Sequence, residues 1–113
     1  MQGRATSKYV RVSSTKLRPY VDVVRGSIVS KALGWLKTCP TRRVEPIEKV
    51  IFSAFSNVRN NVQDVSMDDL FIKMIKVDQG PTVRYFKPSA MGRASVQRKR
   101  LSHIEVVIEK IIK

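Results

Sequence analysis

The first residues that could do chemistry are a run of cations between Gln79 and Ile104. This stretch contains six lysines and arginines and no aspartate or glutamate. Such side chains neutralise phosphate groups, and the interleaved Tyr85 and Phe86 are suited to stacking on bases. The pattern therefore favours a surface that binds nucleic acid. Its cations are Arg84, Lys87, Arg93, Arg98, Lys99 and Arg100.

The chain of 113 residues carries a net charge of +13, and the excess lies at two places. Residues 1–21 and 79–104 contain cations but no acid, whereas residues 22–78 hold nine cations against seven acids. Self-repulsion on this scale opposes folding unless an anionic partner screens it. Nucleic acid, an anionic membrane surface and an acidic protein are the candidate partners. The N-terminal cations are Arg4, Lys8, Arg11, Lys16 and Arg18.

Residues that could support catalysis or bind a metal are few. Cys39 and His103 are the only cysteine and the only histidine, which excludes an internal disulfide and gives no support to a cysteine-rich zinc site or a His-paired nucleophile. The one close pair of acids, Asp68-Asp69, is typical of a helix cap or a solvated turn. We therefore expect no enzyme, no cofactor and no metal. No apolar run approaches the roughly 20 residues that span a bilayer, so we expect a soluble compartment.

The elements that must position the cations follow from hydrophobic periodicity. Apolar residues recur every three or four positions in three stretches, which predicts three helices. Alternating or β-branched patterns in three other stretches predict strands. The expected helices run from caps at 13–15 to Gly26, over about 27–37 and over 47–58; the expected strands are 6–12, 70–77 and 104–112.

The last two expected strands flank the acid-free stretch. If they pair antiparallel, residues 79–103 must leave the body and return as a long hairpin, with Pro88 and Gly92 bracketing its turn. Arms of about 12 residues at ~3.3 Å per residue reach about 40 Å. An isolated ribbon of that length is marginal in water, so a partner must hold it. The sequence thus predicts one α+β domain: three helices on a small three-stranded antiparallel sheet form the body (1–78 and 104–113), and the hairpin (79–103) protrudes.

The stretches SSTKLRPYVDVVRG, IEKVIFSAFSNV and VDQGPTVRYFKPSAMGRASVQRKRLSHIEVVI, in this order, resemble the bacterial-type large-subunit ribosomal protein L-twenty-two family. The resemblance covers nearly the whole chain. It implies binding to large-subunit ribosomal RNA, with a hairpin that lines the peptide exit tunnel near ribosomal protein L-four. Other large-subunit proteins and the nascent peptide are then further partners, and no membrane is. The implied location is the ribosome of the cytoplasm, and an organellar ribosome stays open.

The charge pattern and the resemblance together give two sets of candidate site residues. Those expected to bind RNA are Arg4, Lys8, Arg11, Lys16, Arg18, Arg25, Arg84, Lys87, Arg93, Arg98, Lys99, Arg100, Ser102 and His103. Those expected to form the tunnel-lining tip are Pro88, Ser89, Ala90, Met91, Gly92, Arg93 and Ala94. Small residues at the tip let a backbone pass close to nucleotides. Met91 stands where the family often has a cation, so this tip is less basic than usual.

Other interpretations stay open at this point. The chain could be a free-standing basic RNA- or DNA-binding module, whose partner would exchange. Residues 98–100 alone could be a solvated charge run or a nuclear-import patch. The first two expected helices could form a helix-turn-helix, although SIVSKALGWLK offers few side chains that read bases.

Overall fold

The computed structural model describes residues 2–61, 65–88, 92 and 94–111. It contains an antiparallel sheet of three strands and three α-helices, which confirms the predicted α+β class. Two 3₁₀ turns, η1 (Arg42–Val44) and η2 (Met67–Asp69), precede α3 and β2. In chain order the strands and helices are β1 (Gln2–Val10), α1 (Ser14–Val24), α2 (Val29–Thr38), α3 (Glu45–Asn61), β2 (Leu70–Pro88) and β3 (Ala94–Lys110).

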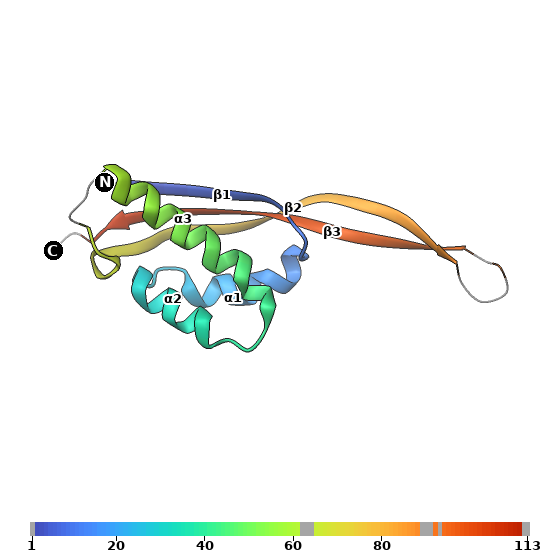
Figure 1. The fold of residues 1–113 in the computed structure, drawn as a ribbon, viewed down its shortest axis with the longest axis horizontal. Coiled ribbons are helices and arrows are strands. Elements are labelled where there is room, and N and C mark those ends of the chain that lie inside the picture. The colour runs from blue at the N-terminus through green and yellow to red at the C-terminus, as the bar shows by residue number, and fades with distance from the viewer. Residues whose placement is uncertain (1, 62–64, 89–91, 93, 112–113) are drawn as a thin grey trace.

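The sheet narrows along its length from three strands to two. Its order is β1-β3-β2, with β3 in the centre. β1 accompanies β3 only as far as the pair Val10 and Ser102, whereas β2 stays paired with β3 out to Pro88 and Ala94. The two longer strands therefore continue past the body as a hairpin (Figure 1). The resulting molecule measures 65 × 25 × 17 Å, and its radius of gyration of 17.2 Å exceeds the ~13 Å expected of a compact chain of this length.

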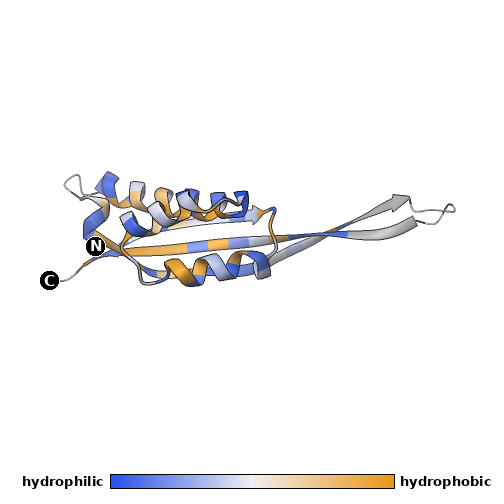
Figure 2. Cartoon of the chain, turned by 90° about the horizontal axis from the view of Figure 1, so that it is seen from below, coloured by the Kyte–Doolittle hydropathy of each residue, from blue (hydrophilic) through white to orange (hydrophobic). Residues whose placement is uncertain are grey.

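The helices cover one face of the body part of the sheet, and the core lies between them (Figures 1 and 2). The predicted apolar stripe on α3 is confirmed, because all six of its residues are buried: Ile47, Val50, Ile51, Ala54, Phe55 and Val58. Gly3 on β1 lets α3 approach closely: a Cβ there would lie 2.7 Å from the carbonyl oxygen of Ala54. In the part of the chain that the structure describes, no helix is long and apolar enough to cross a bilayer.

The connection from α1 to α2 covers the outer edge of β2 within the body. The amide of Gly26 donates to the carbonyl of Ile72 at 3.0 Å, and the amide of Ile72 donates to Ser27 at 2.9 Å. Ile28 forms an isolated bridge with Phe71 on the same edge. These bonds satisfy backbone groups that an edge strand would otherwise expose to pairing with another chain.

The first predicted strand is wrong in its bounds. It was expected over 6–12, but β1 runs from Gln2 to Val10. The pairing slips between Ser7 and Val10, and Tyr9 adopts a positive φ of 59°, so the alternation of faces does not continue to Arg11. The inward positions at the start of β1 are taken by small residues, which carry no apolar signal. β2 and β3 also run further than predicted, since their pairing continues through the hairpin; Ile112, expected on the last strand, lies outside the described residues.

Candidate nucleic-acid interface

The hairpin places like charges opposite one another. Arg84 on β2 faces Arg98 on β3 in the antiparallel register. Both are exposed, as are Lys99 and Arg100. Like charges directly across a sheet destabilise the pairing, in contrast to opposite charges. The hairpin therefore carries a repulsion that an anionic partner would relieve.

A second basic feature is the junction hollow, a depression of about 620 Å³ where the hairpin leaves the body. Four separate segments supply its walls: the link after β1, the first turn of α1, η1 and the root of the hairpin on β3. Of the residues described in the structure, six cations and no acid line it. The lining residues are Arg11, Val12, Ser13, Lys16, Arg43, Arg98, Lys99, Arg100 and Leu101.

Two hydrogen bonds fix the walls of the junction hollow. The hydroxyl of Ser102 is fully buried and donates to the carbonyl of Val12 at 2.8 Å. The amide of Tyr9 donates to Nδ1 of His103 at 3.1 Å, and the two rings meet edge to face at 5.1 Å. Ser102 and His103 were both expected to bind RNA. Here Ser102 offers no side-chain surface, and both residues position the cations around them.

Gly80 permits the close contact between the strands at the hairpin root. The pairing of β2 with β3 is irregular between Gln79 and Thr82. A Cβ on Gly80 would lie 3.0 Å from the carbonyl oxygen of Leu101 and 3.3 Å from Cε1 of His103. A side chain at this position would push β2 away from the strand that carries the root cations.

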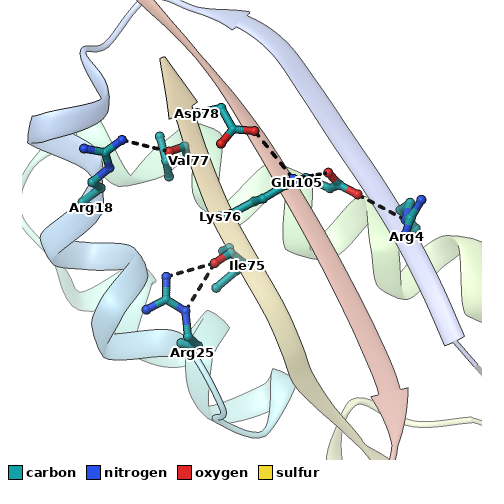
Figure 3. A network of polar contacts seen from close by, with 8 residues as sticks. All are labelled: Arg4, Arg18, Arg25, Ile75, Lys76, Val77, Asp78 and Glu105. Carbon is teal, nitrogen blue, oxygen red and sulfur yellow. Dashed lines mark hydrogen bonds and ion pairs between the residues drawn. The ribbon is translucent and has the colours of Figure 1, made fainter. Parts of the chain in front are cut away.

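Two predicted RNA-binding arginines, Arg18 and Arg25, make contacts within the body (Figure 3). Both donate to backbone carbonyls on the outer edge of β2. Arg18, on α1, donates to Val77 at 3.4 Å. Arg25, the C-terminal cap of α1, donates to Ile75 at 3.0 and 3.3 Å. Arg25 also pairs with Asp22 at 2.7 Å. These bonds attach α1 to the sheet, so Arg18 and Arg25 have a structural role.

The outer face of the body sheet carries a network of ion pairs that crosses all three strands (Figure 3). Glu105 on β3 lies 3.3 Å from Arg4 on β1 and 3.4 Å from Lys76 on β2. Lys73 similarly pairs with Glu109 at 3.3 Å. Arg4 therefore has an internal counter-charge, although its side chain is largely exposed.

The remaining predicted residues lie in two places. Lys8 lines a shallower depression of about 380 Å³ that shares Arg11 with the junction hollow and also contains Arg42, Lys49 and Glu45. Lys87 lies on β2 of the hairpin, and Pro88 and Ala94 end its two strands. Gly92 is exposed, with a φ of +75°. The other tip positions, Ser89, Ala90, Met91 and Arg93, lie outside the described residues.

Sequence reasoning missed Arg43, which lines the junction hollow from η1. Its side chain is exposed, while the neighbouring Val44 is buried and fixes the turn. The available signal was the doublet Arg42-Arg43, which lies between the second and third expected helices. It went unnoticed because residues 22–78 are nearly balanced in charge.

The acidic pair that was considered for catalysis is structural, as predicted. Asp69 accepts from the amide and the hydroxyl of Ser66 at 3.4 and 3.1 Å. The bond from the Ser66 amide is one half of a capping box around η2, and the other half runs from the amide of Asp69 to the side chain of Ser66. Asp68 accepts from the hydroxyl of Ser30 at 2.6 Å.

A comparison with known protein families identifies the group to which this arrangement belongs. The family described as ribosomal protein L22p/L17e matches residues 5–109. The chain belongs to this family. The predicted resemblance is thereby confirmed, and the chain is a ribosomal protein and not an enzyme.

Curated relatives agree over nearly their full length. The chain is 44% identical to a protein of Halothermothrix orenii over 110 residues, or 97% of this chain and 96% of the relative. It is 48% identical to one of Desulfitobacterium hafniense, with 95% and 93% covered, and 46% identical to one of Clostridioides difficile, with 97% and 98% covered. All three are named large ribosomal subunit protein uL22.

Proposed function

We propose that this ribosomal protein is a structural constituent of the large subunit that binds large-subunit ribosomal RNA through its hairpin and the junction hollow. The observation that carries the proposal is the acid-free hairpin, in which Arg84 faces Arg98 across two strands with no carboxylate nearby in sequence. RNA phosphates supply the missing negative charge, and their counterions are released on binding. The naming of the bacterial relatives supports the large subunit of a cytoplasmic ribosome as the location.

The hairpin is the element that we assign to the peptide exit tunnel. Its strands end at Pro88 and Ala94, away from the helices and at the end of the molecule opposite to the start of β1 (Figure 1). The expected tip contains small and apolar residues around a single cation, Arg93. Such a surface offers a passing peptide few strong contacts. The proposed partners are therefore ribosomal RNA, neighbouring large-subunit proteins including L-four, and the nascent peptide.

Co-purification with large subunits tests the RNA-binding proposal. A ribosomal constituent stays with the subunit through washes in moderate salt, whereas an exchangeable nucleic-acid-binding module is released. Release at a salt concentration that leaves other large-subunit proteins bound would contradict the proposal.

Deletion of residues 89–91 tests the tunnel assignment separately. Because the root of the hairpin and the body hold most of the cations, the shortened protein should enter large subunits at near-normal occupancy. Stalling of nascent chains or binding of small molecules in the tunnel should change. If the deletion prevented incorporation, the tip would be an attachment site and the tunnel role would lose its basis.

A further inference from the structure

We propose that the junction hollow is a phosphate-binding site at which one segment of RNA backbone ties the root of the hairpin to the helical body, with Arg43 as the ligand from the body side. The inference rests on the proposed RNA-binding function and deepens it by naming a site and a residue. Arg43 is not among the residues that the sequence predicts to bind RNA.

The charge of the hollow favours the binding of an anion. Among the residues that the structure describes, six cations and no aspartate or glutamate line it. Glu45, which lines the neighbouring depression, is already paired with Lys49 at 3.0 Å. Cations brought together in a depression repel one another, although all six are exposed and solvent screens part of that repulsion. A phosphate group between the cations replaces this repulsion by attraction, because a guanidinium group binds two phosphate oxygens at once.

The walls of the hollow on the body side are held in place before any ligand arrives. The bond from Ser102 to Val12 joins β3 to the link between β1 and α1, and the bond from Tyr9 to His103 joins the end of β1 to β3. Gly80 lets β2 approach β3 beside them. The walls on the body side therefore need little ordering on binding, which reduces the entropic cost of association.

Arg43 makes the hollow a link between two parts of the molecule. It belongs to η1, which leads directly into α3, whereas Arg98, Lys99 and Arg100 belong to the hairpin. A phosphate bound between them contacts the body and the hairpin at once. Binding at this point would fix the direction in which the hairpin leaves the body.

The substitution Arg43→Ala tests the site with little risk to the fold. The amide of Arg43 donates to the hydroxyl of Thr41 at 3.3 Å, and this backbone bond survives the change. Arg59→Ala is the matched control, because it removes the same side chain from an exposed position in the last turn of α3. Arg59 lines neither the junction hollow nor the neighbouring depression.

The first measurement is binding to a transcript of large-subunit ribosomal RNA over a series of salt concentrations. Arg43→Ala loses one phosphate contact, so its affinity for the RNA should fall about tenfold. The slope of log K against log[salt] should become shallower by roughly 0.7 to 0.9. Arg59→Ala should stay within about twofold of the wild type. Equal losses for the two variants would overturn the site. If Arg43→Ala does not fold, Arg43→Lys replaces it. This variant should keep the salt slope, because the charge remains, but should bind RNA more weakly, because lysine cannot donate two parallel hydrogen bonds to one phosphate.

The second measurement uses inorganic pyrophosphate and the free protein, followed by amide chemical shifts. Shifts should concentrate at residues 11–16, 43 and 98–101 in the wild type and weaken in Arg43→Ala. An even spread over all the surface cations would overturn the site. The two measurements test the two proposals separately. If the wild-type protein does not bind the RNA, the proposed function is refuted, while the pyrophosphate titration still tests the phosphate site in the hollow. Binding of pyrophosphate without any effect of Arg43→Ala on RNA affinity would show a site for free phosphate and overturn the RNA contact.

Discussion

β2 and β3 pass through two different environments, and the same two strands are built differently in each. In the body, Lys76 lies opposite Glu105 and pairs with it at 3.4 Å. In the hairpin, Arg84 lies opposite Arg98. The first pairing stabilises the sheet in isolation, and the second stabilises it only when an anion lies between the charges.

The edges and faces of the strands differ in the same way. Within the body, helices cover one face, the α1–α2 connection covers the edge of β2, and Arg18 and Arg25 bind carbonyls on that edge. Beyond Gln79 the third strand has ended, and the side chains of residues 81–84 and 98–100 are exposed. An isolated two-stranded ribbon is marginally stable at best in water. The body is thus a self-sufficient fold, while the hairpin depends on its surroundings.

The largest difference is expected in folding stability, when one valine of β2 is truncated in the body and another in the hairpin. Val77 and Val83 both lie on β2, with exposed fractions of 6% and 49%. Val77→Ala should lower the free energy of unfolding by about 2 kcal/mol, because two buried carbons are lost and a cavity remains. Val83→Ala should change it by less than about 0.5 kcal/mol. Urea unfolding of both variants measures the difference, and equal costs would mean that the hairpin contributes to the folded core.

A smaller but distinct effect is expected for paired charge deletions. Replacing Arg98 and Arg100 by alanine should flatten the salt dependence of RNA binding by about 1.4 to 1.8, as expected for two lost phosphate contacts. Replacing Lys73 and Lys76, which pair with acids of the body, removes the same charge and should flatten it far less. RNA titrations at several salt concentrations test this. Equal slopes for the two double variants would contradict the division between body and hairpin.

The smallest effect concerns the cations that the body uses for itself. Arg25→Ala should cost about 1 kcal/mol of folding stability, since the carbonyl of Ile75 loses its side-chain donor. The salt slope of RNA binding should stay unchanged. Lys31→Ala, at an exposed position of α2, is the control and should alter neither quantity. A reduced slope for Arg25→Ala with normal stability would reassign this arginine to the RNA interface.

The sequence predicts those parts of the fold in which the core imposes a period. The stripe on α3 is confirmed, and Ile104, Val106 and Ile108 on β3 are buried at the predicted spacing of two, because apolar residues repeat at the spacing of the element. The alternation along β3 is incomplete, since Val107 is buried as well. The start of β1 is missed because Gly3 and Ala5, its inward residues, are small. The slip around Tyr9 occurs where its amide binds His103, 94 positions away, and no local pattern contains such a contact.

The candidate site shows a similar limit. The acid-free stretch is visible in the sequence because its cations are neighbours there. The junction hollow is not, since it joins residues near positions 11, 43 and 98 through tertiary folding. Charge counting also included Arg18 and Arg25, because nothing in their local sequence indicates that they bind backbone carbonyls of β2.

Amide hydrogen exchange of the protein, free and in purified large subunits, tests the central claim most directly. In the free protein, amides of β2 and β3 in the body (72–77 and 104–108) should be protected to near the global stability, while those of the hairpin strands (82–88 and 94–100) should exchange rapidly. In the subunit the hairpin amides should become protected and the body amides should change little. Strong protection of the hairpin in the free protein, or rapid exchange in the subunit, would contradict the account.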